Sequence, residues 1–210
     1  MLLFSLFALR PVIPNPSETL LVRNNHLLTV PLFNAWALWW NSLSARHGFR
    51  DYWNAPIFFP TEGAFTFSEP QPATLAVAPV IWFGGSPVLA YNVYFLISLI
   101  LNGLVTWWVL IRRKCTPVQA MIGGGMMIWL PVSLRQFEVL QLVPVWPILW
   151  MWHSLDRHRQ APCPRSAAAI AMAAIATFAS SVHHGLFAMV SLAFAGWFQA
   201  CSLEIADSGV

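Results

Sequence analysis

The chain has 210 residues, of which 58% are hydrophobic and only 9% are charged, and its formal net charge is +3. Soluble domains carry about a quarter charged residues, so this composition argues against a water-soluble fold. The cationic residues form short clusters beside apolar runs, rather than a basic face or tail, which argues against a nucleic-acid partner. We therefore expect the lipid bilayer to be the principal partner of the chain.

The N-terminal segment, residues 1–9, is apolar and ends at Arg10. A signal peptide would carry a basic residue ahead of the apolar run and a small-residue cleavage site after it, and neither is present. The segment is also much shorter than the ~20 residues that a membrane-crossing helix needs. We interpret it as the end of a first span whose start is missing or wrongly assigned, with a cytoplasmic N-terminus.

Residues 14–70 are expected to form an extracytoplasmic loop that carries interfacial helices. Within this loop, residues 31–41 are predicted to be helical, because aromatic side chains recur along PLFNAWALWWN at roughly helical spacing. An aromatic stripe of this kind is typical of a helix lying at the membrane surface. The apolar run 75–83 is predicted not to span, because Pro79 and the prolines just before it break the helical pattern.

Three carboxylates of the outer loop, Asp51, Glu62 and Glu69, are the candidate catalytic residues. A carboxylate beside apolar surface could act as a general base toward a sugar hydroxyl, or could bind a divalent cation that bridges a diphosphate. The alternative is that they are ordinary loop charges that cap turns. The sequence contains no DxD, ExD or DD pair, so the need for a cation stays open and no metal ligand is assigned.

The strongest span, residues 87–111, is free of charge and stops at Arg112, Arg113 and Lys114. Short cytoplasmic loops are enriched in Lys and Arg, so this end is predicted to be cytoplasmic. Two hairpins are predicted to follow, and the basic cluster between them falls on the same side: 117–134 with 139–155, and 166–181 with 186–203. The predicted fold is an all-α, polytopic transmembrane helix bundle forming one membrane domain, 1–210, with the outer loop between the first two spans.

The outer turns of the two hairpins hold the remaining candidate residues. Arg135 and Glu138 are three positions apart and could pair across a helical turn, or Arg135 could hold a phosphate. His183 and His184 could bind metal or carry protons. Adjacent residues of a helix point in different directions, however, and the alternative is that both are histidines of a turn at the membrane interface without a chemical role. The three cysteines are widely separated and show no metal-binding spacing.

Several stretches resemble the first outer loop and following helices of large bacterial proteins related to the GT-C type glycosyltransferases. These stretches are DYWNAPIFFPTEGAFTFSEPQP with SPVLAYNVYFLISLILNG, and also ALWWN, VLQLVPVWP and SSVHHGLF. The resemblance implies many membrane helices, a polyprenyl-phosphate-linked sugar as donor and a catalytic acid in the first extracytoplasmic loop. Asp51, Glu62 and Glu69 occupy that loop, and Arg50 or Arg135 would balance the charge of the leaving phosphate.

The predicted function is therefore sugar transfer from a polyprenyl-phosphate carrier at the outer face of a bacterial inner membrane, by a GT-C-like enzyme or its remnant. The alternative is a non-catalytic membrane protein that binds a lipid carrier or serves as an assembly subunit. A transporter is less favoured, because the predicted spans lack the ionisable groups that usually mark an ion pathway.

Overall fold

The computed structural model describes residues 1–20, 29–130 and 139–207, with the backbone alone for 198–207. These residues form helices and connecting loops without any β-strand, as predicted for an all-α chain. The helices are α1 Leu2–Ala8, α2 Thr29–Arg46, η1 Ala64–Phe67, η2 Pro72–Val77, α3 Ala78–Trp82, α4 Pro87–Arg112, α5 Pro117–Ile128, η3 Leu140–Leu142, α7 Trp146–Gln160, α8 Pro164–Ser180 and α9 Val182–Asp207.

Helix α4 is the centre of the molecule. Ser86 caps it, its hydroxyl accepting from the Leu89 amide at 3.0 Å, and Pro87 occupies the first turn, where no amide hydrogen is needed. The helix matches the predicted 87–111 to within one residue. In the described part of the chain, α4 alone is both long and apolar enough to cross a membrane.

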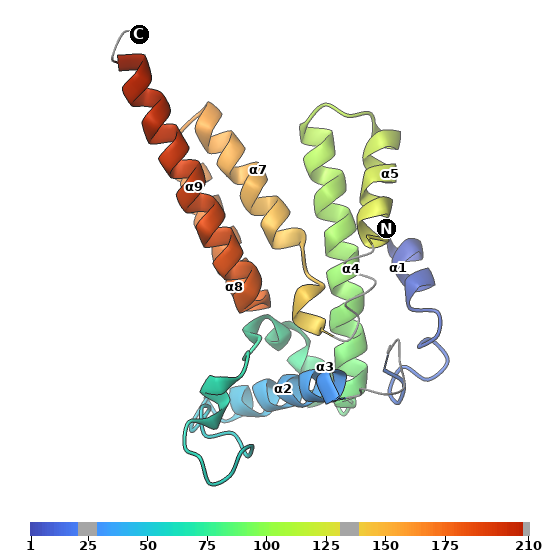
Figure 1. Cartoon of the computed structure of the whole chain (residues 1–210). Helices are drawn as coiled ribbons and strands as arrows, with labels where there is room; N and C mark the ends of the chain where they lie inside the picture. Colours follow the sequence, from blue (N-terminus) through green and yellow to red (C-terminus); the bar gives the residue numbers. More distant parts are fainter. Residues whose placement is uncertain (21–28, 131–138, 208–210) are drawn as a thin grey trace.

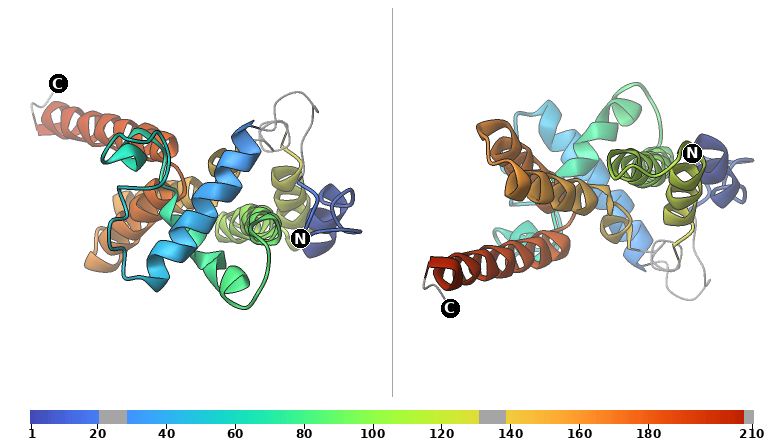
Figure 2. Two further views of the ribbon diagram at one scale, coloured as in Figure 1. Left: turned by 90° about the horizontal axis from the view of Figure 1, so that it is seen from below. Right: turned by 90° about the horizontal axis from the view of Figure 1, so that it is seen from above.

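Two groups of helices flank α4 (Figure 1). Helix α5 folds back along one side of it, with α1 beside both. On the other side α7 contacts α4, α8 packs on α7, and α9 packs on α8. The views along the α4 axis show α7, α8 and α9 on one side of α4 and α1 on the other (Figure 2).

Helix α2 lies across the N-terminal end of α4 and contacts α3 and η2 (Figure 1). Its buried Leu38 joins Tyr91 and Phe95 of α4 in one core cluster. Aromatic side chains of the stripe predicted to anchor this helix pack against the segment that follows α2; its position at a membrane surface stays a prediction. Trp36 stacks on Trp40 with ring centroids 6.4 Å apart and meets Phe65 edge-on at 5.8 Å. The helix, Thr29–Arg46, extends beyond the predicted 31–41 at both ends.

The run 75–83 lies in η2 and α3, which follow one another directly, with Pro79 in the first turn of α3; that this run does not cross the membrane stays a prediction. The prediction of one helix over 139–155 is wrong. That stretch holds η3, then an irregular step at Val143 and Pro144, then α7. Pro144 and Pro147 remove amide hydrogens, so a continuous helix cannot run through the step.

The connection of α8 to α9 is tighter than predicted. Ser181 alone separates them, and its hydroxyl accepts from the His184 amide at 3.4 Å. His183 and His184 therefore lie in the first turn of α9 rather than in a turn between helices.

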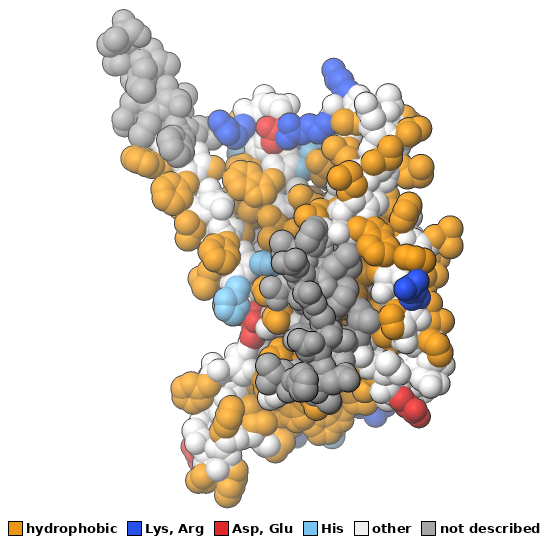
Figure 3. All heavy atoms as spheres, turned by 45° about the vertical axis from the view of Figure 1, so that its right-hand side comes forward, with side chains coloured by type: hydrophobic (Ala, Val, Ile, Leu, Met, Phe, Trp, Pro, Cys, Tyr) orange, Lys and Arg blue, Asp and Glu red, His pale blue; other side chains and the backbone are white. Residues whose placement is uncertain are grey.

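The predicted gathering of basic clusters at one end agrees with the structure. Arg113, just after α4, pairs with Asp156 of α7 at 2.9 Å, which brings the ends of these two helices together. Figure 3 shows Lys and Arg side chains at this end and hydrophobic side chains over the flanks. Helix α2 and the loop lie at the opposite end of α4 (Figure 1).

Candidate functional site

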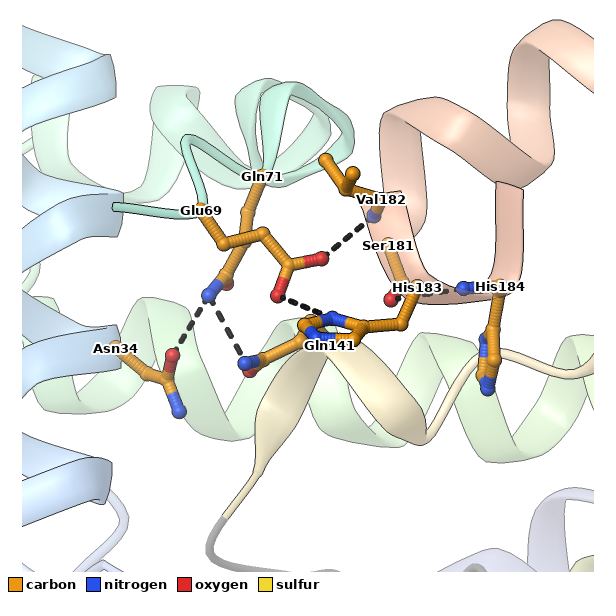
Figure 4. A network of polar contacts seen from close by, with 8 residues as sticks. All are labelled: Asn34, Glu69, Gln71, Gln141, Ser181, Val182, His183 and His184. Carbon is orange, nitrogen blue, oxygen red and sulfur yellow. Dashed lines mark hydrogen bonds and ion pairs between the residues drawn. The ribbon is translucent and has the colours of Figure 1, made fainter. Parts of the chain in front are cut away.

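Glu69, between η1 and η2, is the outer-loop carboxylate that meets a distant part of the chain. Its Oε1 accepts a hydrogen bond from the Val182 amide, 113 residues further on, at 2.6 Å. Its Oε2 lies 3.4 Å from Nδ1 of His183. The Glu69 side chain is 11% exposed. Figure 4 shows the carboxylate reaching from the loop to the first turn of α9.

The His183 contact has an ion-pair distance but not the geometry of a hydrogen bond, because Oε2 has no hydrogen-bond partner within the described chain. This leaves a buried carboxylate oxygen with its acceptor capacity unused. Buried polar groups are nearly always hydrogen-bonded, so this atom is a place where a donor from a bound molecule would be stabilised. The His183 ring beside it is 68% exposed.

The backbone after Glu69 is held by Asn41 of α2. The Asn41 amide group donates to the carbonyl oxygens of Pro70 and Gln71, at 2.6 and 3.2 Å, and to the Thr74 hydroxyl at 2.9 Å. The Asn41 oxygen accepts from the Tyr52 hydroxyl at 2.7 Å. Burial raises the pKa of Tyr52 to about 12, so the hydroxyl remains a donor at neutral pH.

Gln71 ties the same segment to two further elements. Its backbone is left-handed, with φ 49°, and its side chain is buried. Its amide nitrogen donates to Oδ1 of Asn34 at 2.7 Å and to Oε1 of Gln141 at 3.2 Å. Figure 4 shows this amide network directly beside the Glu69 carboxylate. The Gln71 Oε1 atom is also buried with no hydrogen-bond partner in the described chain, a second unused acceptor beside that of Glu69.

The two adjacent histidines differ in role, as the helical geometry predicts. His183 faces Glu69, whereas the His184 ring is half-buried and its Nδ1 has no hydrogen-bond partner among the described residues. The described residues contain no group of three His, Cys, Asp or Glu side chains able to hold a metal ion. A cation at this site would therefore have Glu69 and His183 as ligands, but no third ligand of these types among the described residues.

The other predicted residues do not join this arrangement. Arg50, Asp51 and Glu62 are exposed on the loop that follows α2, and Asp51 accepts through its backbone from the Asn54 amide in a turn. Arg135 and Glu138 lie outside the described residues. Of the eight site residues predicted, the structure brings Glu69 and His183 together, and His184 follows in the same helical turn with its ring away from Glu69.

Sequence reasoning missed the amide side chains that position Glu69, namely Asn34, Asn41, Gln71 and Gln141. One signal was available. Asn34 and Asn41 are seven residues apart, about two helical turns, and so lie on one face of an otherwise apolar helix. A pair of amides on a buried helix face implies polar partners opposite.

Over the described residues these features define an all-helical protein in which one helix is long and apolar enough to cross a membrane, with a polar site where a loop meets the start of α9. The chain belongs to the family described as "Domain of unknown function (DUF6311)", which matches residues 64–204. The matched range includes Glu69, His183 and His184, but not Asp51 or Glu62. No curated protein and no solved structure matches the chain.

Proposed function

We propose first that the chain is a multi-spanning membrane domain. Large apolar side chains are exposed along the flanks of α5, α8 and α9, among them Met121, Ile122, Met126, Met172, Ile175, Phe187, Val190, Phe194 and Trp197. Monomeric soluble proteins rarely expose continuous apolar surface of this extent. In this arrangement α4 crosses the bilayer with the other helices packed around it.

The proposed orientation places the basic end of α4 and α7 in the cytoplasm, by the excess of Lys and Arg in cytoplasmic loops. The loop with Glu69 is then extracytoplasmic, because it lies at the other end of α4. The localisation proposed is a bacterial inner membrane.

We propose that this domain is GT-C-like and transfers a sugar from a polyprenyl-phosphate carrier to an acceptor hydroxyl. The observation that carries this proposal is the buried Oε2 of Glu69, which has no hydrogen-bond partner among the described residues and lies beside the exposed His183 ring. In this mechanism the His183 ring turns aside and the acceptor hydroxyl donates to Oε2. Glu69 takes the proton as the hydroxyl oxygen bonds to the anomeric carbon, and the bond from that carbon to the phosphate oxygen breaks. The carrier phosphate leaves with the electron pair.

Glu69 is preferred to Asp51 and Glu62 as the base. A general base must be held in a fixed position within hydrogen-bond reach of the proton it removes. Glu69 is held by Val182 and by the backbone contacts of Asn41, whereas Asp51 and Glu62 are exposed on an irregular loop.

The test is the Glu69→Gln variant, with Glu62→Gln as the matched control. Glutamine keeps an oxygen for the Val182 amide but cannot take a proton. We expect Glu69→Gln to reduce release of polyprenyl phosphate from a panel of polyprenyl-phosphate sugars by roughly 10²–10⁴-fold, the usual contribution of a general base. The control should keep full activity. Unchanged turnover in Glu69→Gln would exclude Glu69 as the base.

A second candidate, a non-catalytic protein that binds a lipid carrier or assembles with an enzyme, is favoured by one contact. Glu69 Oε1 accepts from the amide at the start of α9, so the same carboxylate also ties the loop to that helix. If Glu69 has only this structural role, we expect the protein to bind a sugar-linked lipid without turning it over. This role also predicts that Glu69→Ala lowers the unfolding temperature while Glu69→Gln preserves it.

A further inference from the structure

A second polar site lies at the opposite end of the molecule, where α4 and α7 end and α8 begins. Two cavities there, of about 320 and 480 Å³, share the lining residues His153 and Arg157. Neither cavity contains residues of the Glu69 site. They are therefore separate from the proposed sugar-transfer centre.

The lining of these cavities is strongly cationic. It includes Arg112, Arg113, Arg157 and Arg165, against one acidic residue, Asp156. Asp156 is already engaged, because its Oδ2 accepts from Arg113 at 2.9 Å and from Gln160 at 3.1 Å. The positive charge of the remaining arginines is thus uncompensated by the described lining residues, which favours an anionic ligand.

His153 is the buried polar group that points to a bound molecule. It is 6% exposed, and neither ring nitrogen has a hydrogen-bond partner in the described chain. Its ring is fixed edge-on against Trp108, with centroids 4.6 Å apart. Because a buried imidazole normally satisfies at least one nitrogen, an oxygen-rich ligand in the cavity would complete the site.

The start of α8 adds a further preference for negative charge. Cys163, Arg165 and Ser166 line the larger cavity, and α8 is a helix of 17 residues. The N-terminus of a helix carries a partial positive charge and binds phosphate readily. Trp108, Trp150 and Ala169 form an apolar wall to the same cavity.

We propose that the larger cavity binds the phosphate group of an anionic ligand. This ligand is either a membrane lipid or a soluble phosphate. Arginines hold phosphate through paired N–H donors. The apolar wall formed by Trp108 and Trp150 suits the glycerol and upper acyl region of a lipid. The phosphate assignment does not depend on the sugar-transfer function.

The test uses the full chain in detergent, and native mass spectrometry to measure the affinity for short-chain phosphatidylglycerol. The Arg157→Gln/Arg165→Gln chain removes two cavity arginines. The Arg10→Gln/Arg159→Gln chain removes the same charge from residues that do not line the cavity. His153→Phe keeps a ring against Trp108 but removes both nitrogens. A loss of lipid affinity in this variant therefore cannot be explained by the removal of arginine charge.

We expect the cavity double variant and His153→Phe to bind phosphatidylglycerol at least roughly tenfold more weakly, as for lost charge-assisted hydrogen bonds. The control double variant should bind as the unmodified chain does. Displacement of the lipid by inorganic phosphate at similar affinity would assign the site to soluble phosphate, and its failure would assign the site to lipid. Equal loss in both double variants, or equal affinity for phosphatidylcholine, would overturn the proposal.

Discussion

Asn102 shows how a single polar side chain supports the break between η3 and α7. It is fully buried in α4. Its nitrogen donates to the Val143 carbonyl at 2.8 Å, and its oxygen accepts from the amides of Val145 and Trp146, both at 2.9 Å. These are the backbone groups that a continuous helix would have paired internally, so Asn102 replaces the hydrogen bonds lost at the step.

Replacing Asn102 with Ala should therefore lower the free energy of unfolding by roughly 2–4 kcal/mol, since one buried and two partly buried backbone groups lose their partner. Denaturant unfolding in a fixed detergent measures this. Ser98→Ala is the control, because the Ser98 hydroxyl bonds to the Tyr94 carbonyl of its own helix and not to the step. A loss in Asn102→Ala no greater than in Ser98→Ala would show that the step does not depend on this side chain.

The polar residues of the predicted span were visible in the sequence, but their function was not. Asn102 and Asn92 could be read only as uncharged exceptions in an apolar run. Asn92 proves to hold the N-terminal segment, donating to the carbonyls of Pro16 and Thr19, both at 2.8 Å. Partners more than 40 residues away cannot be inferred from local pattern, because they depend on how the helices pack.

At the scale of elements, the packing of α4 against α5 depends on glycine. A Cβ added at Gly124 would lie 2.6 Å from the Gly103 carbonyl oxygen and 2.4 Å from the Met1 methyl group. The first of these contacts is with backbone, which cannot move aside without shifting α4. Small residues at such crossings allow membrane helices to approach closely.

Gly124→Ala should thus destabilise the protein by about 1–3 kcal/mol, as an overpacked contact does. Gly196→Ala is the matched control in α9, where an added Cβ meets nothing within 4 Å. Since alanine favours helix over glycine, the control should be unchanged or more stable by up to about 1 kcal/mol. Thermal unfolding of the two variants side by side makes the comparison, and equal behaviour would contradict close packing at Gly124.

At the scale of the whole molecule, the basic end and the Glu69 end lie at opposite ends of α4. If the domain crosses the membrane as proposed, cysteines at the two ends should differ in access to a membrane-impermeant maleimide. A chain that keeps only Cys163, which is exposed near the basic end, should react in spheroplasts only after the membrane is disrupted. Glu62→Cys in a chain lacking its own cysteines should react at once.

Two outcomes of this labelling would contradict the proposed topology. Reaction of Cys163 in intact spheroplasts, with Glu62→Cys protected, would reverse the orientation. Reaction at both positions without disruption would contradict a crossing between them. The Glu69 proposal requires the loop to face outward, so the experiment also tests a condition of the proposed chemistry.

The amino-acid sequence by itself determined the all-helical class, the extent of α4 and the concentration of charge at the basic end. These depend on local properties: hydropathy over a helical length, the Ser86 and Pro87 start, and the arginines that stop the apolar run. The sequence also indicated Pro79, which lies in the first turn of α3. It failed at 139–155, where apolar composition masked the effect of Pro144 and Pro147.

Only the tertiary structure decided which carboxylate meets the start of α9. Asp51, Glu62 and Glu69 are similar in the sequence, each on a polar, aromatic-rich loop. Glu69 differs because Asn41 and Gln71 hold its backbone against α2 and η3, and because Val182 lies opposite. Such a contact joins residues 113 positions apart, so it follows from the packing of whole helices rather than from any local pattern.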